Sequence, residues 1–539
     1  MKRAKLLHLS LLLMVIGGCL TWLTSVRGTI HLRPGIEVCD FVDSGGEVRK
    51  LPFSLTLKEF QTDYYPGMSF PQDFRSILTI DGTEMAISMN HIGRVGAWRI
   101  YQQSFDGQGG SIVEMVRDPW GILAVYLGFI LFAVAGFPML FGRKALSLGL
   151  LCVSLGAMAS PVNESQQVIF NGRVVPYATV ASELTFKLTG AQKVGGMNSS
   201  DFVYSLMEYP RLWAEKPFLK TKAGFISPAS LYDAQGQYIP QLKYQGGEGK
   251  EDAELIRIDE KIALLSQLWQ GELFIPAPEE SRRPEAEVRA EVLYVKIQPV
   301  KWFFMFALMF GILGVISRIG AIGRIGSMVA FGLSLLIFSW RWWILGHCPV
   351  VGTGEVMFFA SLCLCGCSVW LWRKYAFAGA LSLIMAGFAA LISWLNVKNP
   401  SMTPLMPVLN SPWLSIHVSL VMISYALLGM VSILALGSLI RRRFMVVVQK
   451  LLPVGVYFLG LGIIVGSMWA NVSWGRYWGW DPKETAALIT FLVYSVALHP
   501  WFKRHLTARG QAIFLTAAFL TILMTYVGVN YLPSLHSYQ

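Results

Sequence analysis

The sequence predicts an all-α polytopic membrane protein with about eleven transmembrane helices and extracytoplasmic soluble domains, the first of them β-rich. Three observations support this fold class. First, 54% of the 539 residues are hydrophobic and only 14% are charged. Second, apolar runs of roughly 18 residues or more recur, and a helix of that length crosses about 30 Å of hydrocarbon. Third, the basic residues gather in short connectors between these runs.

The apolar runs are predicted to span the membrane at residues 6–26, 119–141, 145–161, 301–317, 325–345, 355–372, 376–395, 413–440, 452–471, 484–500 and 511–530. They divide the chain into five parts. These are a first transmembrane helix (1–26), a β-rich extracytoplasmic domain (27–118), two transmembrane helices (119–161), a second extracytoplasmic domain (162–300) and an eight-helix membrane core (301–539).

The net charge of +12 reflects membrane topology. If the spans simply alternate, all the basic connectors fall on one side of the membrane, which is the positive-inside pattern. We therefore expect a multi-pass protein of the bacterial inner (cytoplasmic) membrane, with a cytoplasmic N-terminus and with the C-terminus and both large domains outside. The basic residues form no binding face, so nucleic-acid binding is not indicated. The connectors carry Lys2/Arg3/Lys5, Arg143/Lys144, Arg318/Arg324, Arg373/Lys374, Arg441/Arg442/Arg443 and Lys503/Arg504/Arg509.

The N-terminus permits two interpretations. Lys2 and Arg3, an apolar run and the residues before Cys19 are typical of a lipoprotein signal that is cleaved before Cys19. The apolar stretch continues through Leu23, which favours a retained membrane span. Cleavage would remove His8.

The two polar regions differ in pattern. In the first, residues 76–80 and 83–89 alternate around Asp81-Gly82, which predicts a β-hairpin. The second mixes a strand-like segment, residues 184–188, with a predicted amphipathic helix. The apolar face of that helix carries Leu255, Ile258, Ile262, Leu265 and Leu268.

Between Trp469 and Glu484 the chain reads WANVSWGRYWGWDPKE, flanked on both sides by apolar helical segments. An interfacial aromatic belt accounts for one or two tryptophans at a helix end. Four tryptophans separated by glycines indicate instead a flat, wide binding surface for a large planar ligand, and a porphyrin fits that description. We call Trp469, Trp474, Trp478 and Trp480 the tryptophan cluster.

The histidines separate by their predicted depth in the membrane. His417 and His536 lie at the outer side, near the tryptophan cluster, whereas His8 and His499 lie at the cytoplasmic side. A histidine at a helix end is often only an interfacial residue, but polar residues at membrane depth are costly and are candidates for function. Neutral imidazole is a good axial ligand of haem iron. The pairing predicts two haem sites, one at each side.

Haem propionates need cationic partners, and Arg476, Lys483 and Arg341 are candidates. Asp481, followed by Pro482, is also typical of a helix start, where an acidic side chain caps the first turn. Capping alone explains Asp481, but it does not explain the tryptophan cluster.

The sequence resembles the haem-handling (WWD) family, in particular the fused cytochrome c synthases of System II. The segments that carry the resemblance are 474–484 (WGRYWGWDPKE), 411–418 (SPWLSIHV), 535–538 (LHSY), 492–499 (LVYSVALH) and 6–10 (LLHLS). The resemblance covers residues 301–539 closely and residues 1–300 more loosely. No motif ties 162–300 to the family, and Ala486 stands where an aromatic residue is expected.

The resemblance implies a role for each candidate. The iron of haem b, bound as substrate, is expected to take pairs of histidines as axial ligands, namely His8, His499, His417 and His536. The haem is expected to contact Trp469, Trp474, Arg476, Tyr477, Trp478 and Trp480. The catalytic set implied by the family is His417, His536, Trp474, Trp478, Trp480 and Asp481.

The same resemblance implies a holocytochrome c synthase of the haem lyase type. Such an enzyme exports haem across the membrane and joins it by thioether bonds to the CxxCH motif of an apocytochrome c, whose thiols a thioredoxin-like protein keeps reduced. Two alternatives stay open. One is a haem transporter or chaperone that delivers haem without ligating it, and the other is a polytopic scaffold whose tryptophans form a dense interfacial belt.

Overall fold

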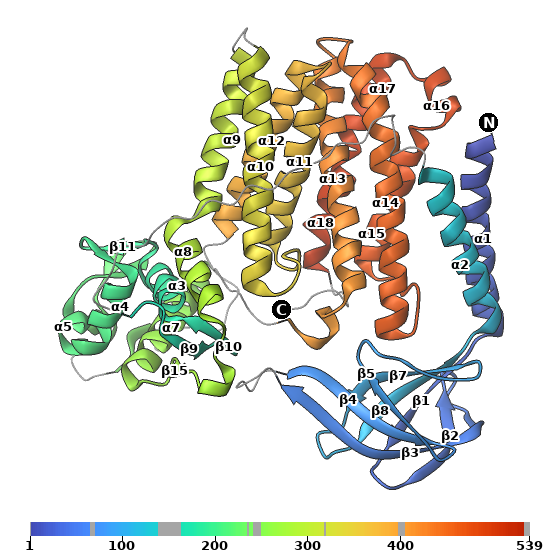
Figure 1. The fold of residues 1–539 in the computed structure, drawn as a ribbon, viewed down its shortest axis with the longest axis horizontal. Coiled ribbons are helices and arrows are strands. Elements are labelled where there is room, and N and C mark those ends of the chain that lie inside the picture. Colours follow the sequence, from blue (N-terminus) through green and yellow to red (C-terminus); the bar gives the residue numbers. More distant parts are fainter. Residues whose placement is uncertain are drawn as a thin grey trace.

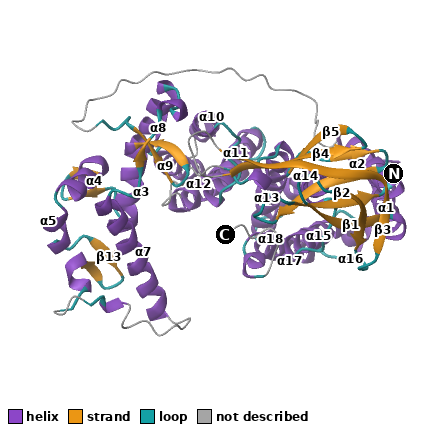
Figure 2. Cartoon of the chain, turned by 90° about the horizontal axis from the view of Figure 1, so that it is seen from below, coloured by secondary structure: helices purple, strands orange, loops and turns teal. Residues whose placement is uncertain are grey.

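In the computed structural model the long helices stand side by side, and two polar regions lie at the same end of them (Figure 1). The structure describes residues 2–64, 71–137, 163–233, 237–240, 250–316, 320–396 and 405–532. Seen from below, a β-sheet lies on the side of α13 and α14, and the second polar region extends away on the side of α9 (Figure 2).

Among the described residues, nine helices are long and apolar enough to cross a membrane. Eleven spans were predicted. The predicted span at 145–161 lies outside the described residues, and the one at 484–500 corresponds to a helix of only 15 residues, α15 (Pro482–Val496), because the chain turns at residues 497–499. The nine are α1 (Lys2–Thr24), α2 (Pro119–Gly136), α9 (Pro299–Ile316), α10 (Gly320–Leu345), α11 (Thr353–Trp372), α12 (Ala376–Asn396), α13 (Pro412–Ser438), α14 (Phe444–Trp474) and a segment, Ala508–Tyr531, that includes α17 (Ala508–Ala517) and α18 (Phe519–Tyr526).

Three of the basic connectors within the described residues lie at the end of the bundle opposite the two polar regions (Figure 1). Arg373 and Lys374 join α11 to α12, and Arg441–Arg443 join α13 to α14. Lys503 and Arg504 lie in the short helix α16 (Pro500–His505) at the same end. This arrangement agrees with the alternation on which the positive-inside interpretation depends.

The first polar region is an eight-stranded antiparallel sheet in the order β5-β4-β3-β2-β1-β8-β7-β6. The predicted hairpin is confirmed, because Ile80 pairs with Thr83 around a turn in which Asp81 and Gly82 have φ of 46° and 82°. A bridge between Ser88 and His91 links the end of β5 to the start of β6. The strands are β1 (Val26–Leu32), β2 (Glu37–Asp43), β3 (Val48–Tyr64), β4 (Pro71–Ile80), β5 (Thr83–Ser88), β6 (Gly93–Val95), β7 (Trp98–Phe105) and β8 (Ser111–Arg117).

The second polar region is mainly helical. The amphipathic helix is confirmed as α7 (Lys250–Gln270), with Leu265 and Leu268 in the core. Residues 184–188 are not a strand but part of α3 (Tyr177–Thr189), and the strand prediction was wrong because this helix is buried on nearly every side and so shows no helical amphipathic pattern. The other elements are β9 (Gln167–Phe170), β10 (Arg173–Pro176), β11 (Lys193–Val194), β12 (Met197–Asn198), α4 (Ser199–Glu208), α5 (Pro210–Glu215), β13 (Leu219–Thr221), β14 (Gly224–Ile226), β15 (Ile275–Pro276) and α8 (Glu285–Ile297).

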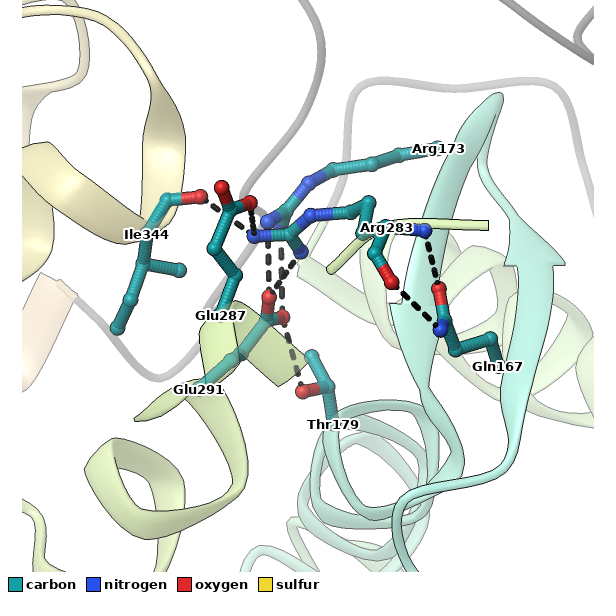
Figure 3. Close-up of polar contacts among 7 residues, drawn as sticks. All are labelled: Gln167, Arg173, Thr179, Arg283, Glu287, Glu291 and Ile344. Atoms are coloured by element: carbon teal, nitrogen blue, oxygen red, sulfur yellow. Dashed lines mark hydrogen bonds and ion pairs between the residues drawn. The ribbon is translucent and has the colours of Figure 1, made fainter. Parts of the chain in front are cut away.

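A buried cluster of charges attaches this region to the membrane helices (Figure 3). Glu291, which is fully buried, accepts hydrogen bonds from Arg173 (2.9 Å), Thr179 (3.0 Å) and Arg283 (2.6 Å). Arg283 also donates to the backbone carbonyl of Ile344, near the end of α10, at 2.7 Å. Removing one partner of a buried ion pair costs roughly 3–5 kcal/mol of folding free energy. The cluster therefore fixes how the second polar region is attached to the membrane helices.

Candidate functional site

The signature loop, defined here as residues 475–481, connects α14 to α15 at the end of the bundle that carries the sheet (Figure 1). Gly475 ends α14 with φ of 68°, a conformation that glycine adopts without steric cost. Trp480 has φ of 57°, which is unusual for a bulky residue and marks local backbone strain. The loop is therefore held in a specific, strained shape.

Asp481 closes the loop as the N-cap of α15. Its carboxylate accepts a hydrogen bond from the Lys483 backbone N–H at 2.8 Å. Glu484 reaches back to accept from the N–H groups of Gly479 (2.7 Å) and Asp481 (3.3 Å), which completes a capping box. The capping interpretation of Asp481 is confirmed. A catalytic role for it stays a prediction.

The tryptophan cluster is not a flat surface, so that prediction was wrong. Trp469 and Trp474, both in the last turns of α14, meet at 61°, and Trp478 and Trp480 meet at 86°. Trp469 is only 2% exposed, whereas Trp480 is 73% exposed. Neither pair of indoles is coplanar, and the two pairs lie on either side of the turn at Gly475. The indole rings of the tryptophan cluster therefore present their edges and faces in several directions.

His417 lies in the second turn of α13, and its ring is held in one orientation. Its Nδ1 lies 2.7 Å from the carbonyl oxygen of Gly462 in α14. A carbonyl only accepts, so Nδ1 carries the proton and the lone pair of the neutral ring is on Nε2, the arrangement usual for metal-ligating histidines. A Cβ at Gly466 would lie 2.7 Å from both Cε1 and Nδ1 of this ring, so glycine is required for the close approach.

The structure brings His8 and His499 together from opposite ends of the chain. Their ring centroids are 5.6 Å apart, and the rings are nearly perpendicular. His8 lies on α1, and His499 lies in the turn just before α16, at the end of the bundle opposite the signature loop. Two imidazoles from distant segments thus share one location.

The remaining histidines fall elsewhere. His536 lies outside the described residues. His31 pairs with Asp106 at 2.9 Å, and His505 stacks on Trp501. His347 contacts the carbonyl of Cys348 at 3.2 Å.

The β-rich region contacts both the signature loop and the neighbouring ends of α13 and α14, a feature that the sequence patterns did not indicate. Arg27 of β1 donates to the carbonyl of Gly475 at 2.7 Å. Asn90 donates to the carbonyls of Pro407 (2.9 Å) and Asn410 (3.1 Å), just before α13, and accepts from Ser473 at 3.2 Å. One signal was available: residue 27 directly follows the first span, so it must lie at the same membrane face as the loop.

A cavity of about 450 Å³ lies between the sheet and the signature loop. Arg27, Tyr101, Glu114, Trp474 and Arg476 are among the residues that line it. Arg27 pairs with Glu114 at 3.3 Å. Burial raises the pKa of the Glu114 carboxyl, while the guanidinium groups of Arg27 and Arg476 oppose that shift. The cavity therefore combines two cations and one partly desolvated carboxylate beside an indole.

Several polar atoms of the site are buried without a hydrogen bond of normal geometry to any described residue. They are the hydroxyls of Tyr101 and Tyr477 and the indole N–H of Trp478. Burial raises the pKa of both phenols, and the nearby Arg99 opposes the shift. Unsatisfied buried groups are uncommon, and here they border the same loop.

The three propionate candidates separate clearly. Arg476 lines the cavity. Lys483 supplies a backbone N–H to the cap of α15. Arg341 was a poor candidate, because its guanidinium contacts Glu355 at 2.8 and 3.0 Å on the other half of the bundle. An ion pair already occupies it.

The residues present fit a haem substrate. Cationic side chains (Arg27, Arg476) and an indole line the cavity, buried polar groups without a partner border the same loop, and an oriented imidazole (His417) lies in the second turn of α13, outside the cavity lining. Imidazole suits iron, guanidinium suits carboxylates, and aromatic faces suit a porphyrin ring. No group of three or more metal-ligating side chains occurs among the residues that the structure describes.

Comparison with known proteins assigns the two ends of the chain. The Cytochrome C assembly protein family matches residues 350–536, and the ResB-like family matches residues 5–118. Protein NrfI of Wolinella succinogenes is 26% identical over 90% of this chain and 71% of its own length. Cytochrome c biogenesis protein CcsA of Chlamydomonas reinhardtii is 33% identical over 42% of this chain and 72% of its own length.

Among solved structures, the cytochrome c heme lyase CcmF aligns with 42% of this chain and 45% of its own chain. The TM-score is 0.35 and the sequence identity is 19%, so this likeness supports no argument. The match to CcsA is stronger, since it extends over more than two thirds of that protein. Together with the family match over residues 350–536, it shows that this membrane protein belongs to the cytochrome c assembly family and is a cytochrome c biogenesis protein.

Proposed function

We propose that the chain exports haem b across the bacterial inner membrane and attaches it through thioether bonds to the CxxCH motif of an apocytochrome c. It thus acts as a fused System II cytochrome c synthase of the WWD type. The proposal assigns roles to the five parts predicted above: residues 1–161 form the partner half with its external domain, residues 162–300 the second external region, and residues 301–539 the catalytic membrane core.

The observation that carries the proposal is the fixed orientation of His417. The Gly462 carbonyl holds the proton on Nδ1 and thereby places the lone pair of the neutral ring on Nε2, and Gly466 leaves the space that the ring needs. A ligand histidine needs both features, because second-shell hydrogen bonds fix its tautomer and its ring direction.

The protein's contribution to the reaction is mainly positioning. In each thioether-forming step a reduced Cys thiol adds across a haem vinyl group: sulfur bonds to one vinyl carbon, the thiol hydrogen goes to the other, and no oxidant is consumed. Holding thiol and vinyl in attack geometry supplies several kcal/mol of the barrier. His417 and His536 hold the iron, the tryptophan cluster and Tyr477 surround the ring, and Arg27 and Arg476 meet the propionates.

His8 and His499 hold haem at the cytoplasmic side before export. The 15-residue helix α15 separates His499 from the signature loop, which is roughly 22 Å at about 1.5 Å per residue. One haem cannot contact both pairs at once, so the substrate moves outward along the bundle. A thioredoxin-like protein is expected to keep the apocytochrome thiols reduced.

Coexpression with an apocytochrome c in a host without its own maturation system tests the proposal. We expect haem-stained cytochrome with the wild type, loss with His417→Ala, and partial rescue by added imidazole, which supplies the missing ligand. His347→Ala is the matched control, because His347 lies in the connection between α10 and α11, outside the site. Purified protein that carries haem but yields no covalent cytochrome would support the haem-carrier alternative. A colourless protein from haem-rich cells would overturn both.

A further inference from the structure

A second cavity, of about 580 Å³, lies at the end of the bundle opposite the signature loop, where α10, α11 and α12 meet. Its lining includes Arg324, Ile325 and Met328 of α10, Trp372 at the end of α11, and Arg373 and Ala376 before and at the start of α12. None of the proposed haem-site residues lines this cavity. The cavity therefore calls for an explanation of its own.

The inner wall of this cavity is a rigidly packed indole. A Cβ at Gly314, Gly323 or Gly379 would lie 2.9, 2.2 or 2.8 Å from atoms of Trp372, so three helices use glycine to admit this one ring. Trp372 is 7% exposed, and its indole N–H has no hydrogen-bond partner among the described residues.

The outer part of the cavity has a charged side and an apolar side. Arg324 and Arg373 are exposed and form no ion pair within the described part of the chain. Ile325 is 61% exposed and Met328 is 54% exposed, and both lie on a membrane helix. Two cations thus border the membrane surface, and apolar side chains continue from them toward the hydrocarbon region.

We propose that this cavity binds an anionic phospholipid from the leaflet on the side of the basic connectors. The phosphodiester lies between Arg324 and Arg373, and an acyl chain covers Ile325 and Met328 against the wall formed by Trp372. Basic pockets between membrane helices recognise lipid headgroups in this way. The guanidinium groups donate hydrogen bonds to the phosphate, and the acyl chain packs against apolar side chains of the helices. A soluble phosphate would leave the apolar half of the cavity uncovered.

Native mass spectrometry of the full-length protein in detergent tests this, with phosphatidylglycerol and phosphatidylcholine supplied in equal amounts. We expect retention of phosphatidylglycerol over phosphatidylcholine, and a loss on the order of tenfold in R324Q/R373Q, the change expected for removing charge-assisted hydrogen bonds. R441Q/R442Q removes two exposed charges from the same end of the bundle but from outside the cavity, so it should retain the lipid.

Ala376→Phe gives an independent variant that keeps both arginines and fills the cavity, and it should also lose the lipid. Equal retention by R324Q/R373Q and R441Q/R442Q would overturn the proposal, since binding would then follow net charge alone. So would retention by Ala376→Phe, or displacement of the lipid by millimolar inorganic phosphate. Cytochrome yield is a separate readout, so this test can fail while the proposed function stands.

Discussion

At the residue scale, the close packing of His417 against α14 determines what its imidazole can do. The Gly462 carbonyl fixes its tautomer, and Gly466 provides the space for the ring. The sequence identified His417 as a candidate, but neither glycine could be recognised, because both are small apolar residues in an ordinary membrane helix. Their roles come from the crossing of α13 and α14, which no local pattern encodes.

Gly466→Ala should displace the His417 ring, since the added Cβ would lie 2.7 Å from two of its atoms. Overpacking of this kind costs about 1–3 kcal/mol, so haem retention should fall at least about fivefold in the absorption spectrum of the purified protein. Gly332→Ala in α10 is the control, because nothing lies within 4 Å of its added Cβ. Equal spectra for the two variants would show that the ring has room to move.

At the element scale, the signature loop depends on its two ends, the glycine cap of α14 and the capping box of α15. The sequence predicted the second end correctly from Asp481-Pro482, since helix starts carry strong local signals. It did not predict the relative orientation of the indoles. That orientation follows from the positive φ at Gly475 and Trp480, and sequence pattern carries no information on the second of these.

Asp481→Asn should retain most of the cytochrome yield, whereas Asp481→Ala should lose much of it. Asn caps a helix about as well as Asp, while Ala costs roughly 0.5–2 kcal/mol. Haem-stained cytochrome and thermal unfolding of the two variants would be compared directly. If both fail equally while their unfolding temperatures match the wild type, the carboxylate has a role beyond capping.

The β-sheet acts on the loop through Arg27. Arg27→Ala removes the hydrogen bond to Gly475 and leaves Glu114, whose side chain is 14% exposed, without its ion pair. Faster hydrogen–deuterium exchange over residues 475–481 and a lower cytochrome yield should follow. Arg33→Ala, at an exposed position just after the end of β1, removes the same charge as a control. Similar exchange in both variants would mean that the sheet does not hold the loop.

At the scale of the whole molecule, the sequence predicted the layout better than the details. Hydropathy located the nine described spans and the two polar regions, because length and apolarity suffice to recognise a membrane helix. The attachment of the second region through Glu291 was not foreseen, since its partners come from three separate segments. Residues 184–188 were misread because a fully buried helix shows no amphipathic period.

The alternation of spans predicts which surfaces face outward. Cys39, exposed on β2, should react with a membrane-impermeant maleimide in cells whose outer membrane has been permeabilised, and Cys39→Ser should remove most of the label. Arg442→Cys in that background should react only after lysis. Labelling at position 442 in the permeabilised cells before lysis would contradict the predicted orientation.

The meeting of His8 with His499 has a consequence for how the protein is made. One imidazole comes from the part matched by the ResB-like family and the other from the part matched by the Cytochrome C assembly protein family, so covalent linkage fixes their stoichiometry at one to one. Tethering also replaces a bimolecular encounter by an intramolecular one with a high effective concentration. A gene split between the two parts would lose this guarantee whenever the fragments were synthesised in unequal amounts.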